Sequence, residues 1–163
     1  MHKKYKLIVV VASLVVIFDQ LVKIYVDNSM RLHQSIEVVE NFLNITYIRN
    51  RGAAFGMFAG VNESYRVPFF LVVTFIAICV ILFMVRSYKD GSFFYPFSLA
   101  LILGGALGNM IDRVRMGEVI DYIDVHWYQH HWPAFNVADS AISVGVAFLF
   151  IHMFTVEKGG KEG

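Results

Sequence analysis

The chain has 163 residues, 57% of them hydrophobic, and its mean hydropathy of +0.57 is too high for a soluble globular domain. A formal net charge of +1 without a clustered Lys/Arg block predicts no nucleic-acid partner. The single cysteine, Cys79, excludes an intrachain disulfide framework and a thiolate metal site. These properties predict an integral membrane protein.

Four apolar runs are long enough to cross a hydrocarbon core, which takes about 20 helical residues. We predict an all-α integral membrane protein of one membrane domain, 1–163, with spans at 7–26, 67–85, 93–111 and 137–156 and outer loops at 27–66 and 112–136. The first run follows lysines, as in a signal peptide. It continues as "FDQLVKIYV" without a small-x-small cleavage site, so we predict a permanent helix.

Charge sets the expected orientation of the spans. The N-terminus, the turn at 86–92 and the C-terminal tail are very short segments rich in lysine and arginine, whereas most acidic residues lie in the longer loops. The positive-inside bias is strongest in short segments. We therefore predict that both termini are cytoplasmic and that the two long loops lie outside.

The first long loop carries a strand-like pattern. Apolar and polar residues alternate in "LNITY" at 43–47, which predicts one or two half-buried strands with a hairpin turn near Glu40 and Asn41. The glycine-containing stretch "RGAAFGMFAG" at 51–60 predicts a loop or short helix on the membrane surface.

Asp19, Gln20 and Lys23 interrupt the first span near its outer end. A charge at mid-bilayer costs roughly 2.5–3.5 kcal/mol on insertion scales, so such residues face a bundle interior or water. Asp19 precedes Lys23 by four, which favours an ion pair, and Lys23 could also extend to the surface. The pattern leaves structural support and a direct functional role for Asp19 both open.

The third span ends in a polar cluster. The small-residue stretch "GGALG" at 104–108 predicts close approach of another helix. Asn109, Asp112 and Arg113 then share one helical face. Because Asp112 near a helix C-terminus opposes the macrodipole, we expect Arg113 or Arg115 to hold it, which favours an architectural role.

The fourth span opens with "FNVADSAISVG" at 135–145, where Asn136 is the predicted N-cap and Asp139 follows in the first turn. The helix dipole stabilises an ionised carboxylate there, so Asp139 is either a capping acid or a functional one. Asp121, among the apolar residues of "EVIDYIDVHW" at 118–127, supplies a second acid that we expect to be half-buried.

Two converging carboxylates can hydrolyse an amide: the ionised acid takes a proton from water, and the protonated acid polarises the carbonyl and protonates the leaving amine. We expect Asp139 to be the more readily ionised partner. From the residues alone, three alternatives stay open: a proton relay in a transporter, a Ser/Lys protease using Ser140 or Ser143 with Lys23, and a non-enzymatic scaffold.

The segment "HWYQHHWPAF" at 126–135 contains three candidate metal ligands, His126, His130 and His131. Its tryptophans and tyrosine are typical of the aromatic belt at a bilayer surface, where neutral histidines are also found. We favour the belt, and expect no metal and no cofactor.

Five blocks together resemble one family. They are "DQLVK" at 19–23, "NRGAAFG" at 50–56, "GGALGNMIDRV" at 104–114, "GEVIDYIDVHW" at 117–127 and "FNVADSAISVG" at 135–145. In this order around four spans, they closely resemble the bacterial lipoprotein signal peptidases, or signal peptidase II, over the full length of the chain.

The resemblance implies a four-helix membrane aspartic peptidase with a small extracytoplasmic β-sheet, called a cradle, and a short surface helix that closes over the site. It implies Asp121 and Asp139 as the catalytic pair. Carried over block by block, it implies that these residues bind substrate or support the pair: Asp19, Lys23, Asn50, Gly52, Asn109, Asp112, Arg113 and Asn136.

The implied substrate is a prolipoprotein whose cysteine carries diacylglycerol, cleaved on the N-terminal side of that cysteine. Membrane lipids and substrate-mimicking peptide inhibitors are the other expected partners, and we expect a monomer. The implied location is the bacterial cytoplasmic (inner) membrane, with the active site at its outer face. Small residues in "NRGAAFG" would let a flap pack over bound peptide and exclude water.

Overall fold

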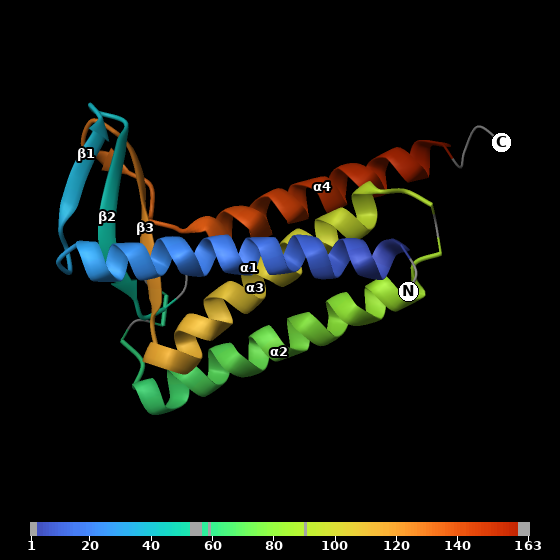
Figure 1. Ribbon diagram of the computed structural model, residues 1–163, viewed down its shortest axis with the longest axis horizontal. Coiled ribbons are helices and arrows are strands. Elements are labelled where there is room, and N and C mark those ends of the chain that lie inside the picture. The colour runs from blue at the N-terminus through green and yellow to red at the C-terminus, as the bar shows by residue number, and fades with distance from the viewer. Residues whose placement is uncertain (1–2, 53–56, 59, 90, 160–163) are drawn as a thin grey trace.

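The computed structural model describes residues 3–52, 57–58, 60–89 and 91–159. Its four long helices are α1 (Lys3–Ser29), α2 (Glu63–Ser87), α3 (Phe94–Met116) and α4 (Val137–Gly159). They run side by side as a bundle, with a small sheet across one end (Figure 1). Each is long and apolar enough to cross a membrane. The prediction of a multi-pass helical membrane protein is confirmed.

The sheet has four antiparallel strands in the order β1-β2-β3-β4: β1 (Ser35–Val39), β2 (Leu43–Asn50), β3 (Val119–Trp127) and β4 (His130–His131). The predicted hairpin between β1 and β2 is confirmed, with Asn41 at a φ of 57° in the turn. The partner of β2 is β3, which enters the sheet directly after α3. The sheet thus brings residues from both long loops together.

Close packing against α3 places the other helices. A Cβ on Gly105 would lie 2.3 Å from the Ala138 carbonyl oxygen of α4, and one on Gly108 would lie 2.7 Å from Asp19 Oδ2 of α1. Only a residue without a side chain permits these approaches. The predicted close helix contact at 104–108 is confirmed, and it joins α3 to two helices.

The charged end of the third apolar run remains helical. Gly117 adopts the left-handed conformation, with a φ of 71°, and its N–H donates to the carbonyl oxygen of Arg113 over 3.0 Å. Asp112 and Arg113 therefore lie on the last turns of α3, beside the sheet.

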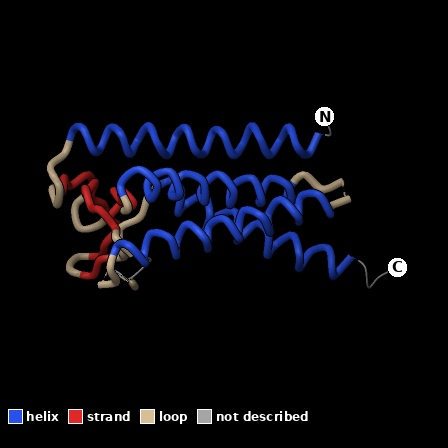
Figure 2. The backbone as a smooth tube through the Cα atoms, turned by 90° about the horizontal axis from the view of Figure 1, so that it is seen from below, coloured by secondary structure: helices blue, strands red, loops and turns tan. Residues whose placement is uncertain are grey.

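Two apolar clusters hold the bundle. One joins α1, α2 and α3 toward the end opposite the sheet, where α1 begins (Figure 1); its members are Ile8, Ala12, Ile81, Val85, Leu99, Ala100 and Leu103. The other fastens the sheet to the end of α1 through Val26, Tyr47, Ile120 and Tyr122. The sheet stays confined to one end of the helices when the molecule is turned (Figure 2). Of the stretch 51–60, which was expected to form a loop or a short surface helix, residues 53–56 and 59 lie outside the described residues.

Candidate active site

A cavity of about 600 Å³ opens where the sheet meets α3 and α4. Asp121 of β3 and Asp139 of α4 both line it, although 18 positions of sequence separate them. Of the other residues carried over by resemblance, Asn50, Gly52, Asn109 and Arg113 also line the cavity. Its remaining wall is largely apolar, with Val119, Trp132, Pro133, Phe135, Ile142 and Val144.

Asp121 is almost fully buried, with 2% of its surface exposed. Its Oδ2 accepts a hydrogen bond from Asn50 Nδ2 (2.9 Å), and its Oδ1 accepts one from Asn136 Nδ2 (2.8 Å). Burial, and then the negative charge of Asp139, raise the pKa of Asp121 to about 7, against the lowering effect of the two amide donors. This carboxyl can therefore hold a proton near neutral pH.

Asn136 joins the two acids. Its side-chain Oδ1 accepts from the backbone N–H of Asp139 (2.9 Å), and its own N–H donates to Asp139 Oδ2 (3.3 Å), a reciprocal cap at the start of α4. The predicted N-cap is confirmed. Because the Asn136 amide also donates to Asp121, one fully buried residue sets both carboxyl groups in place. Asn109 Nδ2 donates to the other Asp139 oxygen, Oδ1, over 2.7 Å.

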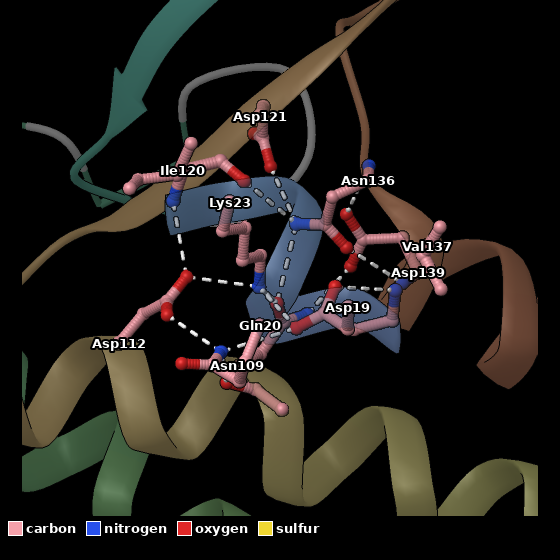
Figure 3. Close-up of polar contacts among 12 residues, drawn as sticks. Asp19, Gln20, Lys23, Asn109, Asp112, Ile120, Asp121, Asn136, Val137 and Asp139 are labelled. Carbon is pink, nitrogen blue, oxygen red and sulfur yellow. Dashed lines mark hydrogen bonds and ion pairs between the residues drawn. The ribbon is translucent and has the colours of Figure 1, made fainter. Parts of the chain in front are cut away.

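Lys23 lies behind this pair, in a buried network shown in Figure 3. Its Nζ donates to Asp19 Oδ2 and Asp112 Oδ2, each over 2.8 Å, and to Asn109 Oδ1 over 2.9 Å. The predicted ion pair with Asp19 is confirmed. Surface extension of Lys23 is wrong, since its side chain is 1% exposed and has partners for all three donors inside the bundle.

The partner expected for Asp112 is also corrected. Asp112 pairs with Lys23 of α1, and its Oδ2 accepts the Ile120 N–H of β3 over 3.2 Å, whereas Arg113 reaches elsewhere. Consecutive helical residues point about 100° apart, so the two side chains cannot serve one contact. Through these contacts Asp112 of α3 is joined to α1 and β3.

Arg113 lines the cavity and has other partners. Its guanidinium lies 4.6 Å from the centre of the Phe70 ring of α2, and its Nη2 donates to the Gly52 carbonyl oxygen over 3.4 Å. The Gly52 N–H in turn donates to Asn50 Oδ1 over 2.9 Å. The backbone of Gly52 thus links the side chain of Asn50, whose amide donates to Asp121, to the side chain of Arg113 on α3.

Asp19 acts on the start of α4. Its Oδ1 accepts the backbone N–H of Ala138 over 2.9 Å, at the end of the helix where N–H groups lack intrahelical partners. From the sequence, Asp19 was expected to face the bundle interior or water, and this contact was not predicted. Gln20, which the sequence marked without a role, donates to the Gly108 carbonyl and to Asp112 Oδ1 (3.2 and 2.9 Å). No periodicity reveals partners this distant.

Two of the three candidate histidines lie against each other, and one of them contacts an acid. The rings of His126 and His131 stack at 4.6 Å between centroids, and His131 Nδ1 contacts Asp124 Oδ1 at 2.8 Å. Among the described residues there is no group of three His, Cys, Asp or Glu side chains arranged for a metal.

A Ser/Lys pair finds no support in the geometry. Lys23 is bound to two carboxylates and an amide oxygen, and the Ser140 hydroxyl donates to the Asn136 carbonyl oxygen over 2.9 Å. A relay through the membrane is also disfavoured, because the apolar cluster of α1, α2 and α3 lies between this network and the far end of the bundle.

A family model described as signal peptidase (SPase) II matches residues 11–155. The chain belongs to the signal peptidase II family. It is therefore a peptidase, as the five blocks indicated.

Individual relatives agree with this family. The chain is 53% identical over 150 residues to a lipoprotein signal peptidase of Geobacter sulfurreducens, and 49% identical over 148 residues to one of Syntrophotalea carbinolica. In both cases about nine-tenths of each chain is covered: 92% and 91% for the first, and 91% and 91% for the second.

The fold is shared with a solved structure described as a bacterial membrane enzyme. The TM-score is 0.85 at 36% sequence identity, and the match covers 96% of this chain and 92% of the other.

Proposed function

We propose that this peptidase removes the signal peptide from prolipoproteins whose cysteine carries diacylglycerol, cutting on the N-terminal side of that cysteine. The observation that carries the chemistry is the pairing of Asp121 and Asp139 through Asn136 at the wall of one cavity. Similarity to proteins named lipoprotein signal peptidase supports the substrate.

In the proposed reaction, Asp139 is the ionised acid, since it lies in the first turn of α4, where the helix dipole favours negative charge. Asp139 takes a proton from a water molecule, which attacks the scissile carbonyl carbon. Asp121 carries a proton near neutral pH, and it donates a hydrogen bond to the carbonyl oxygen. As the tetrahedral intermediate collapses, Asp121 gives its proton to the leaving nitrogen and the C–N bond breaks. The proton that Asp139 took from water then passes to Asp121, which restores the starting protonation of both acids.

The surroundings fit a substrate that arrives from lipid. Signal-peptide helix and diacylglyceryl group both come from the bilayer, and the α4 wall of the cavity includes the apolar Ile142 and Val144. We place the sheet end of the bundle at the outer face of the cytoplasmic (inner) membrane, with both termini inside, where water reaches the acids. The enzyme acts as a monomer that substrate-mimicking peptides inhibit.

The test compares two forms of one prolipoprotein, with and without the diacylglyceryl group, incubated with the purified enzyme. We expect cleavage of the lipidated form alone, with mass spectrometry placing the new N-terminus at the modified cysteine. Ser140→Ala, at a cavity residue without a proposed chemical role, is the control and retains cleavage. Equal cleavage of the unmodified form would overturn the substrate assignment.

A further inference from the structure

Tyr122 directly follows Asp121 in β3, yet it does not line the cavity. Its side chain is buried, with 4% of the residue exposed, and packs in the cluster with Val26, Tyr47 and Ile120. Burial raises its pKa above the ordinary tyrosine value, so its hydroxyl stays neutral over the range in which enzymes work.

The hydroxyl of Tyr122 contacts the start of α4. It accepts a hydrogen bond from the backbone N–H of Val137, the first residue of that helix, over 3.2 Å. The backbone N–H of Tyr122 donates to the Phe135 carbonyl oxygen over 3.1 Å. Tyr122 therefore contacts the residues immediately before and after Asn136, which joins the two acids.

The first turn of α4 is satisfied by three separate parts of the chain. The N–H of Val137 goes to Tyr122 of β3, that of Ala138 to Asp19 of α1, and that of Asp139 to the Asn136 side chain. Helix N-terminal N–H groups have no partner within their own helix. Their acceptors therefore decide how the first turn sits, and with it the carboxyl group of Asp139.

We propose that Tyr122 is a positioning residue for the peptidase reaction, whose hydroxyl caps α4 from the neighbouring strand and so fixes Asp139 relative to Asp121. The role rests on the proposed function of the two acids. Tyr122 acts through the backbone at Val137, since its side chain does not line the cavity. We expect its loss to lower kcat rather than raise KM, because misplaced catalytic groups slow the chemical step more than they weaken substrate binding.

The test is Tyr122→Phe, which keeps the ring and deletes the acceptor. We expect kcat to fall roughly tenfold while KM is unchanged, since a small misplacement of a catalytic group costs this much or more. Tyr47→Phe is the matched control: Tyr47 is equally buried in the same cluster, but its hydroxyl contacts Asp27 and Arg49 rather than α4. We expect this control to retain kcat.

Two further measurements separate positioning from general destabilisation. Thermal unfolding reports the stability of each variant, and ligand binding reports the geometry of the site. A non-cleavable analogue of the tetrahedral intermediate should bind Tyr122→Phe more weakly by the same factor as kcat falls, while a lipidated product peptide binds normally. Wild-type kcat in Tyr122→Phe, or equal losses in both tyrosine variants, overturns the positioning role. Full cleavage by Asp121→Asn would instead overturn the proposed function on which it rests.

Discussion

The proposed acid role of Asp121 predicts how activity depends on pH. Its pKa of about 7 comes from burial and from the charge of Asp139. Below that pH the carboxyl is protonated and can donate to the substrate carbonyl; above it the proton is lost. We therefore expect kcat to fall as pH rises through about 7, measured on the lipidated substrate between pH 5 and 9. A rate that rises steadily through this range would contradict the acid role.

The amide of Asn50 provides an internal control for that pH dependence. Its hydrogen bond to Asp121 Oδ2 stabilises the ionised form and lowers the pKa of Asp121. Asn50→Leu removes this donor, so the pKa of Asp121 rises. We expect the loss of activity at high pH to begin at a higher pH in this variant. A shift to lower pH would show that another group controls the profile.

Lys23 is predicted to matter most to the assembly of helices, because it joins α1 to α3. Lys23→Met leaves the carboxylates of Asp19 and Asp112 buried without their cation. Breaking a buried pair in this way costs about 3–5 kcal/mol. We expect a loss of this size in the free energy of unfolding, measured with the purified protein in detergent micelles.

The comparison for Lys23 is an exposed ion pair in the same protein. Arg49 and Asp27 lie 3.1 Å apart with side chains 39% and 35% exposed. Because water screens such a pair, Arg49→Met should cost below about 1 kcal/mol. Equal losses in the two variants would mean that the buried network contributes no more than a surface contact.

Gly105 sets the separation of α3 and α4. A methyl group there would lie 2.3 Å from the Ala138 carbonyl oxygen, so Gly105→Ala must push α4 aside, and Asp139 with it. We expect a loss of about 1–3 kcal/mol in the free energy of unfolding, together with reduced kcat. Gly91→Ala, where no atom of the described residues lies within 4 Å of an added Cβ, should change neither. An unaffected Gly105→Ala enzyme would show that the helices are not held at this distance.

At the scale of elements, sequence patterns predicted the features that depend on residues close together in the chain. Apolar runs predicted the four helices, alternation predicted the β1–β2 hairpin, and Asn136 was recognisable as an N-cap because its partner Asp139 is three residues away. The pairing of Asp112 was wrong because the competing cation, Lys23, lies on another helix. The contact of Tyr122 with Val137 likewise depends on how β3 meets α4, which periodicity does not encode.

Over the whole molecule, the buried polar network and the larger of the two apolar clusters lie toward opposite ends of the bundle. The acids, amides and Lys23 gather beside the sheet (Figure 3). An apolar cluster joins α1, α2 and α3 toward the other end. The family resemblance implied that these polar residues lie together at one site. From residue types alone, the same acids were compatible with a relay, because sequence does not say at which depth distant side chains meet. The arrangement places both acids of the proposed reaction at the sheet end of the bundle.

The central claim is that Asp121 and Asp139 act as one catalytic unit. Single-turnover cleavage of the lipidated prolipoprotein by Asp121→Asn, Asp139→Asn and the double variant tests it most directly, with folding checked by thermal unfolding. We predict that each single change lowers the rate by about 10³-fold or more and that the double variant is no slower than the singles, since residues acting together are non-additive. A folded single variant that keeps a substantial part of the wild-type rate would contradict the account.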